Sequence, residues 1–382
     1  MKALRNFINN VKPQFEKGGK FEKFRSTFGA FETFLFVPDT TNQNGVHVRD
    51  AVDLKRTMSV VILALIPSLL FGMYNVGYQH FHMLGQTDVT FVETFLFGFL
   101  KVLPIVIVSY VVGLGIEFIT AQIRGHEVNE GFLVSGMIIP LVMPADAPLW
   151  MVAVSTAFAV IFGKEVFGGT GMNIWNPALV ARAFFFFAYP SKISGDQVWI
   201  ADKIDSYSGA TPLALANAGD TTTYCICDCV SGFIPGSIGE TSVIAIAIGA
   251  FVLLLTGVAS WKTMLSVFVG GALMGLLFNQ FGSEANHMAQ LPWYHHLAIG
   301  GFCFGAVFMA TDPVTSARTE LGKYIYGFLI GAMAIIIRVL NPGYPEGMML
   351  SILLLNTFAP LIDYCIVQAN ISKRKNRVKI KS

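Results

Sequence analysis

Long apolar blocks alternate with short polar connections between residues 58 and 366. The first block, 58–74, has 17 residues without a charge, at the short end of the roughly 17–25 residues that a spanning helix needs. Nine more blocks follow, near 98–120, 131–144, 148–163, 176–189, 242–260, 263–281, 295–311, 322–340 and 346–366. This pattern predicts an all-α polytopic membrane protein with about ten transmembrane helices.

The stretch from 91 to 119 is less regular, because Glu93, Lys101 and Pro104 interrupt it. A proline inside a helix removes a hydrogen bond and favours a kink or an end. An interfacial segment followed by a shorter span is therefore an alternative to one continuous helix here.

Two blocks are too short for simple spanning helices. Blocks 131–144 and 176–189 hold 14 residues each, about 21 Å of helix against a hydrocarbon core of about 30 Å. The run EGFLVS at 130–135 is echoed by EGMMLS at 346–351, and Ala-Pro-Leu follows each run. Short paired segments are typical of an inverted repeat, although chance similarity between apolar stretches is the alternative. We expect two inverted five-helix repeats with broken half-helices.

Lysine and arginine mark the cytoplasmic side of a membrane protein. Ten of them precede the first block and six lie at 373–381, whereas the long connection 190–241 has only Lys192 and Lys203. Both termini are therefore expected in the cytoplasm, which requires an even number of spans. The predicted organisation is a polar basic segment (1–56), a transmembrane domain (57–366) with an outer loop (190–241), and a basic tail (367–382).

Composition supports a membrane protein. Charged residues make up 13%, about half of the roughly 25% usual in soluble domains, and the mean hydropathy is +0.59. A net charge of +2 excludes a general nucleic-acid-binding role. Cys225, Cys227 and Cys229 lack the spacing of a zinc or iron–sulfur site, so an exposed thiol cluster or a local disulfide is preferred and no metal site is predicted.

Two polar motifs need an explanation. The segment 164–177 combines glycines with Asn173, Asn176 and Pro177; the glycines fit a close-packing turn, but paired amides beside spans need partners. The run Asp-Ser-Tyr-Ser-Gly-Ala-Thr-Pro at 205–212 presents Thr211 at the membrane edge. Alone it reads as an ordinary turn. Thr211 has no base beside it, so it is a poor nucleophile but a possible acceptor for modification.

Seven runs jointly resemble the B subunit of Na⁺-translocating NADH:quinone reductases, over nearly the whole chain. They are HEVNEGF (126–132), KEVFGGTGxNxxNPALxARAF (164–184), ISGDxVW (193–199), DxYSGAT (205–211), IPGSIGE (234–240), MATDPV (309–314) and RVxNPxYPEGMML (338–350). The chain is more distantly similar to the D subunit of the Rnf ferredoxin:NAD⁺ complex, which lacks the long N-terminal segment.

The resemblance implies two flavins. Thr211 matches the position that a separate flavin transferase joins to FMN through a phosphoester, and the rest of the attachment motif is Asp205, Ser208, Gly209 and Ala210. Asn173 and Asn176 match positions beside a non-covalent riboflavin, whose donor and acceptor edges amides can hydrogen-bond without adding charge.

The resemblance also implies quinone and Na⁺ sites. Gly113 matches a quinone-site glycine, and Leu114 replaces a neighbouring glycine found in some relatives, which puts quinone affinity in doubt. Glu117 and Asp363 match carboxylates linked to Na⁺ uptake; a snorkelling acid at a helix end, or one paired with Arg124 or Lys373, is an equal alternative. Phe304 and Phe308 match residues proposed to close the central pathway; one turn apart, they are also consistent with simple packing.

Further expectations concern charged and aromatic residues. Arg182 and Arg338 are expected to neutralise either a flavin phosphate or Glu346. The phenylalanines of the basic N-terminal segment are expected either beside a quinone headgroup or as a plain interfacial anchor.

The expected function is that of a bacterial inner-membrane subunit in a six-subunit Na⁺-pumping NADH:quinone oxidoreductase. The chain has no nucleotide-binding domain of its own for NADH, so partner subunits are implied. An Rnf-type D subunit is one alternative. A passive channel or transporter with the same duplicated core is the alternative from a different class.

Overall fold

The computed structural model describes residues 2–16, 18–36, 44–48, 52–86, 88–125, 131–192, 199–202, 209–341, 343 and 346–381. Every regular element in this part of the chain is helical. The α-helices are α1 Lys2–Val11, α2 Arg25–Leu35, α3 Leu54–Met83, α4 Phe91–Arg124, α5 Phe132–Leu141, α6 Leu149–Gly163, α7 Pro177–Ala188, α8 Pro212–Ala218, α9 Ile226–Ser231, α10 Val243–Leu255, α11 Trp261–Phe281, α12 His287–Gln290, α13 Trp293–Ala298, α14 Phe302–Phe304, α15 Glu320–Leu340 and α16 Gly347–Lys381. Short 3₁₀ turns are η1 Lys12–Gln14, η2 Glu22–Phe24, η3 Glu165–Phe167 and η4 Pro190–Lys192, and η5 Gly305–Met309 is a π-helix.

Among the described residues, six helical segments are long and apolar enough to cross a membrane: α3, α4, α6 with η3, α11, α15 and most of α16. Three shorter apolar helices, α5, α7 and α10, lie among them. The predicted polytopic all-α class is confirmed. Each of the ten predicted blocks contains helix, but their number as complete spans stays a prediction, because several are too short to cross alone.

Residues 91–119 lie in one continuous helix, without a break between an interfacial segment and a shorter span. α4 begins at Thr90, whose side chain accepts a hydrogen bond from the Glu93 backbone while the Glu93 side chain accepts one from the Thr90 backbone. Glu93 therefore helps to start the helix rather than interrupt it. Pro104 lies inside α4. The helix ends at Gly125, which has a left-handed conformation.

The predicted block 295–311 is broken into pieces. α13 stops at Ala298, Gly300 has φ +67, and the chain resumes as α14 and the π-helix η5. A positive φ suits glycine because it has no Cβ. π-Helical turns are rare in proteins overall, but those that occur often lie at functional sites. Block 295–311 is therefore a broken segment as well, in addition to blocks 131–144 and 176–189 that the sequence identifies as too short.

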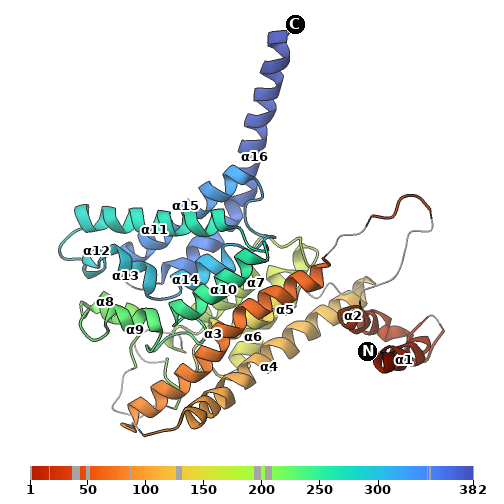
Figure 1. Ribbon diagram of the computed structural model, residues 1–382, viewed down its shortest axis with the longest axis horizontal. Helices are drawn as coiled ribbons and strands as arrows, with labels where there is room; N and C mark the ends of the chain where they lie inside the picture. Colours follow the sequence, from red (N-terminus) through yellow and green to blue (C-terminus); the bar gives the residue numbers. More distant parts are fainter. Residues whose placement is uncertain are drawn as a thin grey trace.

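Several helix contacts recur in the two halves of the bundle. α4 packs against α5 and α6, and α6 against α7; in the second half α11 packs against α13 and α15, and α15 against α16. Figure 1 shows α3 and α4 running side by side and α11 beside α15. The halves meet where α3 contacts α10 and α7 contacts α16. The correspondence is partial, because α3 packs extensively against α4 whereas α10 and α11 make no comparable contact in the described part of the chain. The inverted repeat therefore stays a prediction.

The sequence echo does not support that duplication. EGFLVS leads into α5, which two helices follow in its half, whereas EGMMLS leads into α16, the last helix of the chain. One Ala-Pro-Leu precedes α6 and the other lies inside α16. The two runs are therefore not in equivalent places, and chance similarity explains them better.

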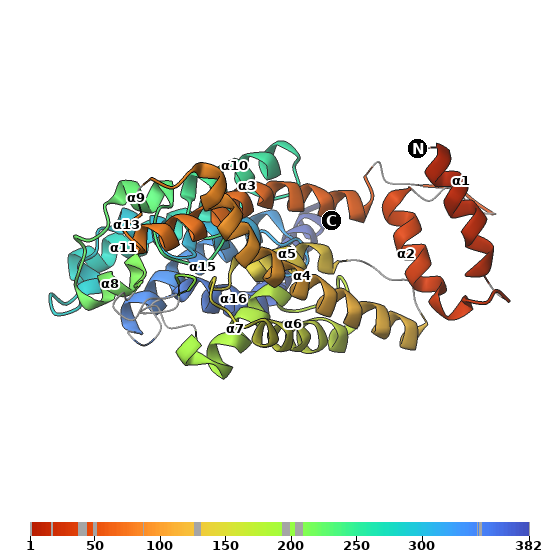
Figure 2. The ribbon, with the colours of Figure 1, turned by 90° about the horizontal axis from the view of Figure 1, so that it is seen from below.

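Both ends of the chain depart from the bundle. α16 continues through the basic tail without a break at 366 and projects from the other helices (Figure 1). α1 and α2 lie beside one another beyond the ends of α3 and α4 (Figure 2). The Phe31 ring on α2 lies 6.1 Å from the Phe118 ring on α4, centroid to centroid.

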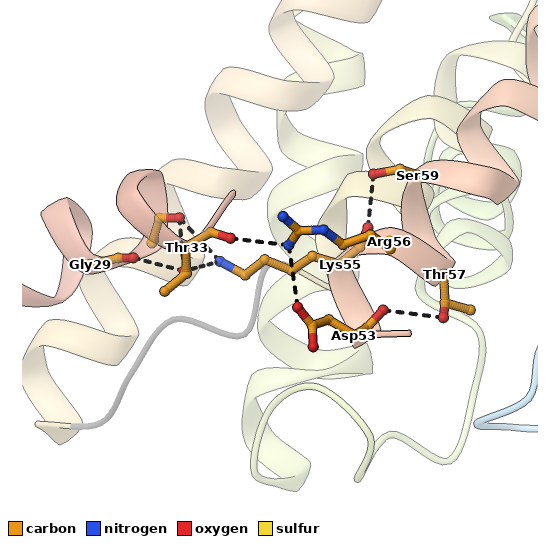
Figure 3. Close-up of polar contacts among 8 residues, drawn as sticks. Gly29, Thr33, Asp53, Lys55, Arg56, Thr57 and Ser59 are labelled. Atoms are coloured by element: carbon orange, nitrogen blue, oxygen red, sulfur yellow. Dashed lines mark hydrogen bonds and ion pairs between the residues drawn. The ribbon is translucent and has the colours of Figure 1, made fainter. Parts of the chain in front are cut away.

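Polar contacts fix α2 to the first turn of α3 (Figure 3). The Lys55 ammonium donates to the Ala30 carbonyl at 3.1 Å and to the Thr33 hydroxyl at 2.5 Å. The Arg56 guanidinium donates to the Thr33 carbonyl at 3.3 Å. The last turn of α2 is thereby held at the entrance to α3.

Candidate functional site

A cavity lies between the first turns of α3, the start of α5, the 164–177 segment, the end of α10 and the chain after η5. Its enclosed volume is about 130 Å³, below the roughly 300–1,000 Å³ of typical small-molecule sites. Most of its wall is apolar, and a few polar side chains point to ligand binding: Ser135, Lys164, Thr170, Asn173, Asn176, Thr311 and Asp312.

The two predicted amides, Asn173 and Asn176, both line this cavity. The Asn176 side-chain carbonyl caps α7 by accepting from the Ala178 amide at 2.9 Å, and its Nδ2 donates to Asp312 Oδ2 at 3.4 Å. Asn173 Nδ2 donates to the Trp175 carbonyl at 3.0 Å. Asn176 is therefore fixed by helix α7 and by Asp312, while Asn173 is held within its own turn.

Phe308 also lines the cavity, and Phe304 lies next to it with ring centroids 4.9 Å apart. Both are buried. Because η5 is a π-helix, Phe308 reaches the cavity from the broken segment rather than from a regular span. The structure thus brings one of the two predicted gating residues to the predicted flavin-binding amides.

Glu117 is buried and forms an ion pair with Lys164, whose side chain is equally buried. Neighbouring Arg124 donates to the Glu165 carbonyl at 2.8 Å and lies 3.7 Å from its carboxylate. The sequence predicts an ionic partner for Glu117 but indicates Arg124. In the structure the partner is Lys164. The sequence signal for Lys164 was a lysine at the end of an apolar span, where a charge needs a partner.

Asp363 has a different environment. Its carboxylate accepts from the Arg318 amide at 2.7 Å, the Thr319 amide at 3.0 Å and the Thr319 hydroxyl at 2.6 Å. These donors fix the start of α15 to α16. Glu117 and Asp363 share none of these partners, so the structure does not join them in one site.

Gly113 is buried on α4, where a Cβ would overlap the ring of Phe132 on α5. Leu114 is half-buried against the core. Gly113 therefore allows α4 and α5 to approach closely, which accounts for a small residue there without a quinone.

Thr211 is half-exposed and caps the short helix α8, with its Oγ1 accepting from the Ala214 amide at 3.2 Å. Gly209, two residues earlier, has φ +57. Asp205 and Ser208 lie outside the described residues, and Ala210 is half-buried. The hydroxyl of Thr211 is thus presented at a turn and is not enclosed in the core.

A cluster of charges, with its arginines buried and its glutamates half-buried, joins several helix ends. Arg182 on α7 lies 2.9 Å from the Glu346 carboxylate and donates to the Val142 carbonyl. Arg338 on α15 donates to the carbonyls of His296 at 2.6 Å and Ile299 at 3.3 Å. The expected partner Glu346 is thereby confirmed for Arg182.

Glu240 completes this cluster, and sequence reasoning missed it. Burial, followed by the nearby Glu346 carboxylate, raises the pKa of Glu240 to about 8, while Arg182 opposes the rise. The signal available was an acid placed directly before an apolar block.

The three cysteines of the outer loop are free thiols. Cys225 and Cys227 are exposed and Cys229 is buried. The predicted local disulfide is therefore wrong, and the predicted exposed cluster holds for Cys225 and Cys227 but not for Cys229. No group of three or more potential metal ligands occurs in the described part of the chain.

Comparisons with known proteins assign the sequence to a family. A sequence model of the NQR2, RnfD, RnfE family matches residues 41–372. Among curated relatives, the B subunit of the Na(+)-translocating NADH-quinone reductase of Chromohalobacter salexigens is 48% identical, over 98% of this chain and 97% of its own length. Those of Pseudomonas aeruginosa and Azotobacter vinelandii are 46% and 45% identical, over 98% of this chain and 99% of their own lengths. With this similarity extending from end to end, the chain belongs to the NQR2, RnfD, RnfE family.

Proposed function

We propose that this chain is the B subunit of a Na⁺-translocating NADH:quinone oxidoreductase of the bacterial inner membrane. The observation that carries the proposal is the match to such subunits over 98% of the chain, including the N-terminal segment docked on α3. The partner subunits, numbering six with this one, supply the NADH site. Both termini lie in the cytoplasm in this proposal.

Thr211 is the proposed attachment point for FMN. Thr211 is half-exposed, as modification by a separate transferase requires, and its Oγ1 accepts a hydrogen bond that a phosphoester oxygen can also accept. Bound FMN supplies electron-carrying chemistry that no side chain offers. The chain's own contribution is to hold the attachment oxygen at the start of α8.

The cavity is the proposed riboflavin site. The amide Nδ2 of Asn176 is held toward Asp312, and the Asn173 side chain lies on the same wall. An apolar wall with a few fixed polar groups suits a flat aromatic ring system. The role of these residues is to bind and orient the ring and to exclude water around it.

Quinone and Na⁺ are the proposed substrates. The N-terminal helices and the α4–α5 contact at Gly113 and Leu114 border the proposed quinone site. Glu117 and Asp363 are proposed on the Na⁺ pathway, with Phe304 and Phe308 closing it, because carboxylate oxygens suit a small hard cation.

A Thr211→Ala variant tests the redox proposal. The complex carrying it should lose the ultraviolet-fluorescent flavin band on a denaturing gel, while Thr221→Ala, an exposed threonine of the same loop, keeps the band. Thr211→Ala should still release riboflavin on acid extraction, and Asn173→Ala should retain it about fivefold to tenfold less tightly for one lost hydrogen bond. A wild-type chain without covalent flavin refutes the proposal and leaves the channel function.

A further inference from the structure

Lys164 lies between two features that the proposed function treats separately. It lines the cavity together with Asn173 and Asn176, and its ammonium pairs with Glu117 on α4. The side chains of Lys164 and Glu117 are each 4% exposed. One buried cation is therefore in reach of both the cavity and the proposed Na⁺ ligand.

The ion pair is incompletely satisfied. Glu117 Oε2 is buried and has no hydrogen-bond partner among the described residues, and beyond the ion pair the same holds for Lys164 Nζ. Removing charges from water is costly unless their remaining positions are filled. The unpaired oxygen of the Glu117 carboxylate can still accept from a donor or bind a cation. The Lys164 ammonium can still donate to a further acceptor.

The backbone around the pair is well anchored. Arg124 donates to the carbonyl of Glu165, the residue after Lys164, and lies beside the Glu165 carboxylate. The Lys164 side chain is a compact charge on a flexible four-carbon stem. The arrangement keeps the backbone fixed while leaving the ammonium able to move.

We infer that Lys164 is a positioning residue that links charge in the cavity to cation binding at Glu117, turning toward the cavity when its occupant becomes negative and freeing the carboxylate for Na⁺. This inference rests on the proposed function, because it needs a redox-active occupant and Na⁺ as the ion.

Electrostatics gives the link its direction. Attraction between charges is much stronger in a protein interior than in water, so a negative occupant competes with Glu117 for the ammonium. A carboxylate that loses its buried partner gains affinity for another cation. Coupling between two binding events is reciprocal, so Na⁺ at Glu117 also favours the negative state of the occupant.

The test is ²²Na⁺ equilibrium binding to the purified complex, oxidised and after reduction with dithionite. Wild type should bind Na⁺ roughly tenfold more tightly when reduced, within the usual range of coupling between sites. Lys164→Gln should bind Na⁺ with the same affinity in both states, at or above the reduced wild-type affinity. Lys164→Arg, which keeps the charge, should retain part of the difference.

Lys262→Gln is the matched control, because Lys262 pairs with the exposed Glu320 away from the cavity lining; it should behave as wild type. If Lys164→Gln proves unstable, the flavin midpoint potential is titrated with and without Na⁺ in the Lys164→Arg and Glu117→Gln complexes instead. Because the coupling is reciprocal, the shift that Na⁺ causes in this potential reports the same link. The inference is overturned if Lys164→Gln keeps the wild-type difference. A wild-type complex that binds no Na⁺ or holds no flavin overturns the proposed function itself.

Discussion

At the scale of residues, buried charges decide the local structure. Arg338 is fully buried, and it donates to two carbonyls at the break between α13 and α14. Arg182 serves α5 in the same way through the Val142 carbonyl. A helix end buried without donors for its carbonyls is costly, so these arginines stabilise the broken helices whatever ion or cofactor the protein handles.

Glu240 carries a pH prediction. Burial and the Glu346 carboxylate raise its pKa from 4.5 to about 8, so the folded state holds this proton more tightly than the unfolded chain. The contribution to stability is complete below about pH 4.5, falls as the pH rises, and is lost above about pH 8. Glu240→Gln mimics the protonated carboxyl and should flatten this decline.

The measurement is the thermal unfolding midpoint in detergent between pH 5 and pH 9, where Glu240→Gln should gain most over wild type at the alkaline end. Asp228→Asn, also outside the long helices, is the control and should follow the wild-type slope. An identical slope in wild type and Glu240→Gln contradicts the prediction.

At the scale of elements, close approach of helices depends on small residues. α4 and α5 meet at Gly113, where a Cβ would overlap the Phe132 ring. Gly115, two residues along the same helix, has open space around a Cβ. Comparing alanine at Gly113 with alanine at Gly115 therefore separates the overlap with Phe132 from the general effect of replacing glycine by alanine in a helix.

Gly113→Ala should lower the free energy of unfolding by about 1–3 kcal/mol, the usual cost of overpacking, and Gly115→Ala should not. Adding Phe132→Leu to Gly113→Ala should recover part of the loss, which thermal unfolding in detergent can measure. A Gly113→Ala complex of wild-type stability with a raised KM for quinone, unrelieved by Phe132→Leu, indicates a direct quinone contact instead.

At the scale of the whole molecule, the docked N-terminal helices and the projecting α16 extend from a bundle of paired helices (Figures 1 and 2). The first turn of α3 holds α2 through Lys55 and Arg56 and also lines the cavity through Leu54, Thr57 and Met58. The first turns of α3 therefore contact both the N-terminal helices and the cavity.

The proposed orientation predicts reporter activities. Alkaline phosphatase inserted after Thr221, in the outer loop, should be active, and the same enzyme fused after Ser382 should be inactive. Green fluorescent protein at the two positions should give the opposite result and serves as the control. Active phosphatase at the C-terminus means that the charge distribution was misread.

The sequence by itself determined the class, the apolar blocks and the residues that carry the family resemblance, because burial in lipid demands long uncharged runs and internally bonded helices. It also foresaw charged partners for Glu117 and Arg182. Only the tertiary structure decided that Lys164 is the partner of Glu117, that α4 continues through Pro104, and that Asn173, Asn176 and Phe308 share one cavity. The ion pair and the shared cavity depend on contacts between segments distant along the chain, which local periodicity does not encode.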